Sequence, residues 1–352
     1  MASTFSPAWF ARGPHAQTIW GRLVRPRRMV ELRREVIETP DGDELILDHL
    51  DAAEEARAPL RFILMHGLEG SSYSAYIQGL LSIIARRGFS ATAINFRSCA
   101  RDPKDTMRML PNRRPRFYHS GETTDFDFVA RMLHARMPDT PLVAIGASLG
   151  GNALLKWLGE HPGQRIISAA ATLSVPYDLG AGAKYLEQGA GPFYVGSFLR
   201  TLKKKVKHVM ERFPENGVDA ANAMRARTFR EFDDAATAPL HGFRDADDYY
   251  TRSSSIHFIG RITTPTLCIS AEDDPFLPHE VLERARATAS PSVEFMTTRY
   301  GGHVGFISGT APWRCVYWAE ELVVDWLVRP RASGLGPATR SPRPEARGLV
   351  IG

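Results

Sequence analysis

The sequence is poor in cysteine and has no long hydrophobic run. Its 352 residues include three cysteines, Cys99, Cys268 and Cys315, and none forms a Cys-x-x-Cys pair, so a disulfide framework is excluded. No apolar run approaches the roughly 18 residues needed to cross a bilayer. The first residues also lack the apolar core and cleavage site of a secretion signal. We therefore expect a cytoplasmic protein without an integral membrane segment, for which peripheral membrane contact stays open.

Signals for metals, cofactors and nucleic acids are also missing. The eleven histidines show no His-x-x-x-His spacing, and no Gly-x-x-x-x-Gly-Lys sequence could hold a phosphate, so we expect no metal ion and no cofactor. The net charge of +5 arises at the ends, because residues 1–34 carry seven arginines and residues 329–352 carry five, each against one acidic residue. The chain between them is acidic, which disfavours a nucleic-acid-binding face.

Short apolar runs alternate with helix-length amphipathic segments. Two β-rich runs, residues 30–37 and 44–50, flank the turn sequence 39–43 and predict a leading antiparallel hairpin. Further runs follow over residues 60–65, 89–96, 142–145, 166–173, 266–269 and 293–296. Such runs separated by helices are typical of parallel strands covered on both faces. The sequence therefore predicts an α/β fold, with a doubly wound, mostly parallel sheet and an antiparallel start.

The alternation is interrupted before the last strands. We predict residues 1–29 as an N-terminal arm, 30–329 as the main domain with a helical cap at about 182–255, and 330–352 as a disordered tail. A cap at this place would cover an active site. The lysine-rich run 203–207 is expected to be the solvated face of a cap helix rather than a binding patch.

A Gly-x-Ser-x-Gly motif at residues 146–150 directly follows the apolar run 142–145. In this setting the serine lies on a sharp strand-to-helix turn with its hydroxyl exposed above the sheet. The glycines are needed because side chains would block the tight turn. Ser148 is therefore the candidate nucleophile, and the alternative is a serine in an ordinary glycine-rich turn.

A serine nucleophile needs a base to take its proton and an acid to orient that base. Asp274 follows the run 266–269 in an Asp-Pro-x-x-Pro setting, with Asp273 or Glu272 as its polar neighbour or its rival. His303 follows the next run and is flanked by glycines. The order serine, acid, histidine is the one that this fold class uses. We predict His303 as the general base and Asp274 as its orienting acid.

The negatively charged oxygen of a tetrahedral intermediate also needs hydrogen-bond donors. We predict that one donor is the backbone N–H of Leu149, directly after the nucleophile. The other is predicted to be the N–H of Leu68, in the glycine-containing loop after the run 60–65. His66 is expected to brace this loop.

These motifs together resemble the α/β-hydrolase superfamily, and more narrowly the hydrolase-4 family of YheT-like bacterial esterases and their lipid-hydrolysing relatives. The segments that carry the resemblance are residues 13–19, 66–71, 95–97, 118–123, 146–152, 237–243, 273–276 and 303–306. The resemblance implies a triad of Ser148, Asp274 and His303 and activity on carboxylic esters. The sequence departs from the family pattern in the arginine-rich stretch 101–116, which is expected to be an elongated surface loop.

The leading hypothesis is a cofactor-independent serine hydrolase that forms an acyl-enzyme with short- to medium-chain acyl esters or monoacylglycerols. An acyltransferase or phospholipase with the same triad is the alternative within catalysis. A non-catalytic binding protein of the same fold is the alternative from another class, and it is disfavoured because all three triad residue types are present.

Overall fold

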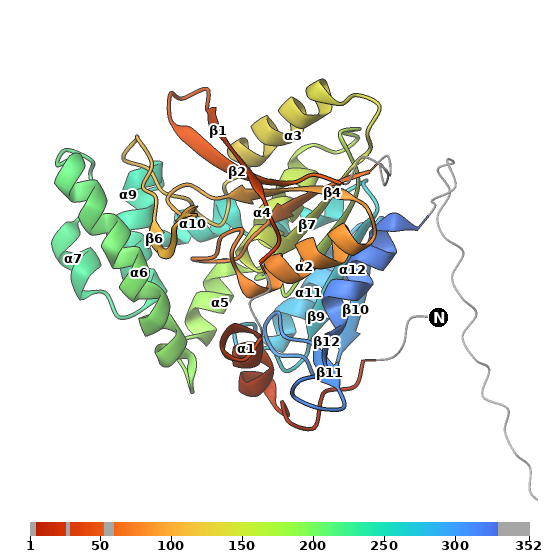
Figure 1. Ribbon diagram of the computed structural model, residues 1–352. Coiled ribbons are helices and arrows are strands. Elements are labelled where there is room, and N and C mark those ends of the chain that lie inside the picture. Colours follow the sequence, from red (N-terminus) through yellow and green to blue (C-terminus); the bar gives the residue numbers. More distant parts are fainter. Residues whose placement is uncertain (1–4, 26–28, 53–59, 330–352) are drawn as a thin grey trace, which may run out of the picture.

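The computed structural model describes residues 5–25, 29–52 and 60–329 (Figure 1). The predicted disordered tail, residues 330–352, lies outside the described residues, as do parts of the predicted arm 1–29. No helix among the described residues combines the length and the apolar character needed to cross a membrane.

An eight-stranded sheet forms the centre of the described chain. Its spatial order is β1 (Arg33–Glu38), β2 (Glu44–Leu50), β4 (Ser90–Asn95), β3 (Arg61–Met65), β7 (Leu142–Ala147), β8 (Ile167–Leu173), β9 (Thr266–Ala271) and β10 (Val293–Thr298). The first three strands of this order pair antiparallel. The strands from β4 to β10 pair in parallel. The mostly parallel sheet with an antiparallel start confirms the predicted fold class.

Helices cover both faces of the sheet, which explains why the central strands are continuously apolar. Successive side chains of a strand point to opposite faces, so Phe62 and Leu64 pack in one hydrophobic core and Ile63 and Met65 in the other. The helices are α2 (Ala75–Arg86) and α12 (Trp318–Val328) on one face, and α3 (Thr124–Arg136), α4 (Leu149–Glu160) and α11 (His279–Thr288) on the other. Figure 1 shows α2 and α12 side by side.

The last two strands are longer than their apolar runs. β9 continues to Ala271 and β10 to Thr298, with Ser270 paired against Thr297. Hydrogen bonding to a neighbouring strand extends both elements through polar residues that carry no apolar signal. These carboxyl ends lead directly into the loops that hold Asp274 and His303.

A group of helices is inserted between β8 and β9 and lies to one side of the sheet (Figure 1). It comprises α5 (Leu179–Tyr185), α6 (Gly191–Arg212), α7 (Ala220–Arg225), α8 (Phe229–Phe232), the π-helical turn Asp233–Thr237, α9 (Ala238–His241) and α10 (Ala246–Ser253). α6, α7, α8 and the π-helical turn share a separate core in which Leu202, Val206 and Phe232 are buried, together with Phe276 from the loop after β9. The inserted helices are thus packed onto a loop of the main body.

The lysine-rich run on α6 is not simply a solvated face. Lys204 is exposed, but Lys205 is 4% exposed and forms a buried ion pair with Glu69. The expectation of a solvated face is therefore wrong for Lys205. The partner lies 136 positions away in the sequence, so charge patterning along the helix could not reveal it.

The N-terminal segment is fixed to the chain that follows His303. Gln17 on α1 (Pro14–Leu23) is fully buried, and its amide nitrogen donates to the carbonyls of Ala11 (2.8 Å) and Ile307 (3.0 Å). The Ile307 N–H donates in turn to the Gln17 side-chain oxygen at 2.6 Å. A small hairpin, β11 (Ile307–Gly309) and β12 (Cys315–Tyr317), continues from this junction.

The arginine-rich stretch is more structured than the surface loop expected from the sequence. It contains the hairpin of β5 (Arg101–Asp102) and β6 (Asp105–Met109), and the following residues bind acidic groups. The Arg113 N–H donates to Asp43 Oδ1 at 2.9 Å, and the Arg116 guanidinium pairs with Asp41 at 3.1 Å.

Candidate active site

Ser148 lies at the corner between β7 and α4 in a conformation that non-glycine residues rarely adopt. Its φ of 51° and ψ of −120° store strain of about 1–3 kcal/mol. Two backbone bonds hold the corner: the Ser148 N–H donates to the Leu173 carbonyl at 2.8 Å, and the Asn152 N–H donates to the Ser148 carbonyl at 3.0 Å. The serine is thus held by the ends of two neighbouring strands and by the first turn of α4.

The two glycines of the motif are required by close backbone contacts. A Cβ on Gly146 would lie 2.6 Å from the Gly150 carbonyl oxygen. A Cβ on Gly150 would lie 2.6 Å from the carbonyl oxygens of Met65 and His66, which belong to the end of β3 and the loop after it. Only glycine lets the helix approach both strands this closely, as the motif predicts.

The structure brings the three predicted triad side chains into one hydrogen-bonded chain. His303 Nε2 lies 2.9 Å from Ser148 Oγ, and His303 Nδ1 lies 2.9 Å from Asp274 Oδ2 and 3.2 Å from Oδ1. A carboxylate can accept only from an Nδ1–H, so Asp274 favours the tautomer whose Nε2 is free to accept the serine proton. This is the geometry in which a histidine can activate a serine hydroxyl.

Asp274 is shielded from solvent and oriented from two sides. It is 2% exposed, and its Oδ1 accepts a hydrogen bond from the Phe276 N–H at 2.9 Å. The Phe276 ring stacks on the His303 imidazole with 4.3 Å between ring centroids. Acid and base are therefore both held in place by the short loop after β9.

The two alternative acids occupy other positions. Asp273 Oδ1 accepts from the Gly302 N–H at 2.9 Å, and burial raises the pKa of this carboxyl. Glu272 is exposed. Of the three acids, Asp274 is the one in hydrogen-bond contact with His303.

The loop that carries His303 is positioned by residues for which the sequence alone gave no role. The His303 N–H donates to Thr18 Oγ1 on α1 at 2.9 Å, across 285 positions of the sequence. Val304, whose φ of 57° is a strained value for a β-branched residue, donates its N–H to Ser174 Oγ at 3.0 Å. The only sequence signal for this role of Thr18 is that the segment 13–19 carries part of the family resemblance.

The loop after β3 places Leu68 beside the same site. A tight turn is closed by the Gly70 N–H and the Gly67 carbonyl at 3.0 Å, with Glu69 at a φ of 57°. The Glu69 N–H donates to the Tyr118 hydroxyl at 2.5 Å, and neither bond uses the N–H of Leu68. As the first residue of α4, Leu149 has an N–H without a partner inside the helix. Both leucines line the cavity that contains Ser148 and His303.

His66 braces this turn in a neutral form. The Phe96 N–H donates to His66 Nε2 at 3.1 Å, so the proton resides on Nδ1, which lies 2.8 Å from the Gly67 carbonyl oxygen. Burial lowers the pKa of His66 to about 4. The ring therefore links β3, the end of β4 and the turn without carrying charge at neutral pH.

A buried ion pair connects the same turn to the inserted helices. Lys205 Nζ on α6 donates to Glu69 Oε1 at 2.5 Å and to Cys99 Sγ at 3.1 Å, and it lies 4.7 Å from the centre of the Tyr118 ring. Burial alone would raise the pKa of Glu69, but Lys205 lowers it and keeps the carboxylate charged. Burial also raises the pKa of Cys99 to about 11, so the thiol stays protonated.

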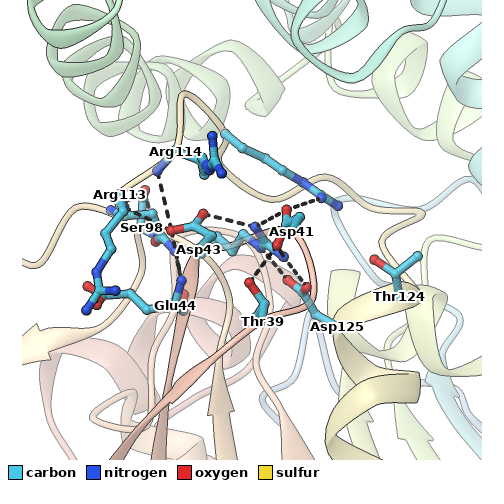
Figure 2. A network of polar contacts seen from close by, with 12 residues as sticks. Thr39, Asp41, Asp43, Glu44, Ser98, Arg113, Arg114, Thr124 and Asp125 are labelled. Carbon is cyan, nitrogen blue, oxygen red and sulfur yellow. Dashed lines mark hydrogen bonds and ion pairs between the residues drawn. The ribbon is translucent and has the colours of Figure 1, made fainter.

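A second charge network lies near the β1–β2 turn (Figure 2). Arg97, two residues after the end of β4, is 3% exposed and binds Asp41 (2.8 Å), Asp43 (2.9 Å) and Asp125 (2.7 Å). Burial alone would lower the pKa of Arg97, but the surrounding carboxylates raise it. The network joins the β1–β2 turn to the start of α3, and it contacts neither Ser148 nor His303.

The site opens into a cavity of about 870 Å³, part of which is open to solvent. Ser148 and His303 line it together with mainly apolar side chains of the inserted helices, among them Leu186, Leu202 and Phe229. Among the described residues, no group of three or more histidine, cysteine, aspartate or glutamate side chains is arranged to hold a metal ion.

Comparisons with known proteins identify the family of the chain. Residues 61–310 match the family model for the alpha/beta hydrolase fold. The chain is 36% identical over 315 residues to YheT of Escherichia coli K12, named as a proposed esterase, covering 89% of this chain and 90% of the relative. It is 33% identical over 315 residues to the mouse phospholipase ABHD3, covering 88% and 74%.

A solved structure supports the fold alone. The esterase Pf2001 of Pyrococcus furiosus superposes with a TM-score of 0.51 at 16% sequence identity, covering 78% of this chain and 83% of that one. The family resemblance predicted from the sequence is confirmed by the two relatives. By its family-model match and its identity to these proteins, the chain belongs to the α/β-hydrolase fold family.

Proposed function

We propose that this protein is a serine ester hydrolase that acts through an acyl-enzyme intermediate. The observation that carries the proposal is the chain of contacts from Asp274 through His303 to Ser148 at the wall of a largely apolar cavity. In the proposed reaction, His303 removes the proton of Ser148 as the oxygen attacks the ester carbonyl. It then returns the proton to the leaving alcohol, while Asp274 stabilises the imidazolium.

The proposed oxyanion donors are the backbone N–H groups of Leu68 and Leu149. Both belong to backbone held by its own contacts, so they need little rearrangement when charge develops on the substrate oxygen. One such donor contributes about 3–4 kcal/mol to transition-state stabilisation. A water molecule then hydrolyses the acyl-enzyme, with His303 acting again as the base.

The proposed substrates are esters of short- to medium-chain acids or monoacylglycerols. Their support is the mainly apolar wall of the cavity, about half of which is contributed by the segment proposed as a cap, residues 182–255. The relationship to a protein named as a phospholipase keeps a phospholipid substrate or acyl transfer as the second candidate. Product analysis with a primary alcohol present separates transfer from hydrolysis, and the cytoplasmic location stays a prediction.

The test is labelling by a fluorophosphonate probe together with hydrolysis of p-nitrophenyl butyrate. Ser148→Ala should abolish labelling and lower kcat by about 10³-fold or more. Ser168→Ala is the matched control, because Ser168 is exposed on the neighbouring strand β8, and it should retain both activities. Full labelling of Ser148→Ala would contradict the proposal. It would also be contradicted if the wild type neither reacted with the probe nor hydrolysed any ester of a chain-length series.

A further inference from the structure

The wall of the cavity contains one carboxyl group that the proposed mechanism does not use. Asp233 begins the π-helical turn Asp233–Thr237 and lines the same cavity as Ser148 and His303. π-Helical turns are rare and occur frequently at functional sites. The position of Asp233 in an otherwise mainly apolar wall therefore calls for a physical explanation.

Two hydroxyl groups hold this carboxyl group in place. Thr237 Oγ1 donates to Asp233 Oδ1 at 2.6 Å, and the Tyr250 hydroxyl donates to Asp233 Oδ2 at 2.8 Å. Both oxygens thus accept hydrogen bonds, which is the pattern suited to a carboxylate. Burial nevertheless raises the pKa of Asp233 to about 7, and the neighbouring Asp234 acts in the same direction.

Asp233 has no ion-pair partner among the residues that the structure describes. Within residues 5–25, 29–52 and 60–329, no lysine, arginine or histidine forms an ion pair with it, whereas Asp247 and Asp248 nearby on α10 both pair with arginines. Asp233 is partly buried, and a desolvated carboxylate without a counter-charge is costly. A positively charged ligand group in the cavity would remove that cost.

The surroundings of Asp233 are aromatic. Tyr250 contacts the carboxylate directly, and Tyr249 lies close enough for Asp233 to raise its pKa. Phe229 packs against the cluster that contains both tyrosines, and Phe232 precedes Asp233 in the chain. All four rings line the cavity. Aromatic rings and a carboxylate lining one cavity form an environment that suits a quaternary ammonium group.

We propose that Asp233 and these four aromatic side chains form a subsite for an ammonium group, so that the preferred substrates are esters carrying a quaternary ammonium group. This inference rests on the proposed ester hydrolysis and specifies its substrate class. The ammonium group would lie against the carboxylate between the rings while the ester carbonyl meets Ser148. Thr237 and Tyr250 position the carboxylate.

The test is a binding measurement on Ser148→Ala, which needs no turnover. Isothermal titration calorimetry at pH 8 compares butyrylcholine with 3,3-dimethylbutyl butyrate, in which carbon replaces the charged nitrogen. We expect butyrylcholine to bind about tenfold more tightly or better, the size expected for a desolvated cation on aromatic faces. Equal or weaker binding of butyrylcholine would overturn the proposal.

Two double variants assign the preference to one carboxyl group. In Ser148→Ala/Asp233→Asn the ratio of the two affinities should fall to about one or reverse. Asp234→Asn in the same background makes the same charge change at the next, exposed position and should retain the preference. A preference that survives Asp233→Asn would refute the subsite, and binding of the neutral ester reports whether the cavity is intact.

A pH series tests the subsite without altering Asp233. Butyrylcholine keeps its charge at every pH, whereas Asp233 becomes neutral below about pH 7, so the preference should decline between pH 8 and pH 6. Three other groups that line the cavity do not titrate there: the pKa values of Tyr249 and Tyr250 are raised by burial, and that of His119 is lowered by burial to about 4. A pH-independent preference would contradict the role of Asp233. Hydrolysis of p-nitrophenyl butyrate by the wild type reports the proposed function separately.

Discussion

Replacing Lys205 with methionine should lower the stability of the fold and loosen the turn of residues 67–70, which carries the proposed oxyanion donor Leu68. The Lys205 and Glu69 side chains are 3% and 7% exposed, so the substitution leaves a buried carboxylate without its counter-charge, although the Tyr118 hydroxyl still donates to it. Breaking one side of a buried pair costs about 3–5 kcal/mol. For an unfolding entropy of about 0.7 kcal/mol/K, this corresponds to a fall in Tm of about 4–7 °C.

The effect on catalysis follows from the position of Glu69. It directly follows Leu68, and its own φ of 57° is maintained by the contacts of its side chain and its N–H. Complete loss of one oxyanion donor costs about 10²–10³ in kcat. Because the Glu69–Tyr118 bond remains, we expect a decrease of about tenfold in kcat for p-nitrophenyl butyrate, with little change in KM.

Two further variants make this prediction specific. Lys204→Met removes an exposed charge from the same helix and should change neither Tm nor kcat measurably. Glu69→Gln combined with Lys205→Met removes both charges and should recover most of the lost stability, because paired removal leaves no uncompensated carboxylate. If Lys205→Met behaves like Lys204→Met, the ion pair does not hold the turn.

Three other outcomes are expected from the same structure. Thr18→Val removes the acceptor of the His303 N–H and should lower kcat by about tenfold while KM stays nearly constant, and an unchanged kcat would show that α1 does not position the base. Gly150→Ala should yield little folded protein by circular dichroism, since its Cβ would meet two carbonyl oxygens at 2.6 Å; a normal melting curve would refute the packing argument. Between pH 7 and pH 5 the free energy of unfolding should fall by about 2 kcal/mol through His66, because its pKa is about 4 when folded and about 6.5 when unfolded and the unfolded state therefore gains the proton first. His66→Gln should reduce that slope in urea titrations, and an equal slope in both proteins would refute it.

The sequence predicted the parts of the site that depend on local patterns. The Gly-x-Ser-x-Gly motif predicts the serine turn because the steric limits of that turn act within a few residues. The loops of Asp274 and His303 could be predicted because each directly follows a strand. Three features depend on partners far along the chain. Thr18 accepts a hydrogen bond from His303, which is 285 positions away, and Lys205 pairs with Glu69, which is 136 positions away. The carboxylate of Asp233 is held by the hydroxyl of Tyr250, which lies on another helix.

Strand ends and the burial of charged residues are poorly marked by hydrophobicity for a related reason. β9 and β10 continue through Ser270 and Thr297 because backbone pairing, not hydrophobicity, determines where they end. The lysine-rich run has the charge pattern of an exposed helix face, yet the side chain of Lys205 is buried. Periodicity describes one element at a time, so it carries no information about which polar residue finds a buried partner.

The most direct test of the central claim is detection of the acyl-enzyme on Ser148. Rapid acid quenching of the wild type with p-nitrophenyl butyrate, followed by intact mass spectrometry and peptide mapping, should show one butyryl group on the peptide that contains Ser148. The same adduct should be absent from Ser148→Ala and should accumulate in His303→Ala only slowly, if at all. Hydrolysis by the wild type without any such adduct under rapid quenching, or an equal adduct in Ser148→Ala, would contradict the account.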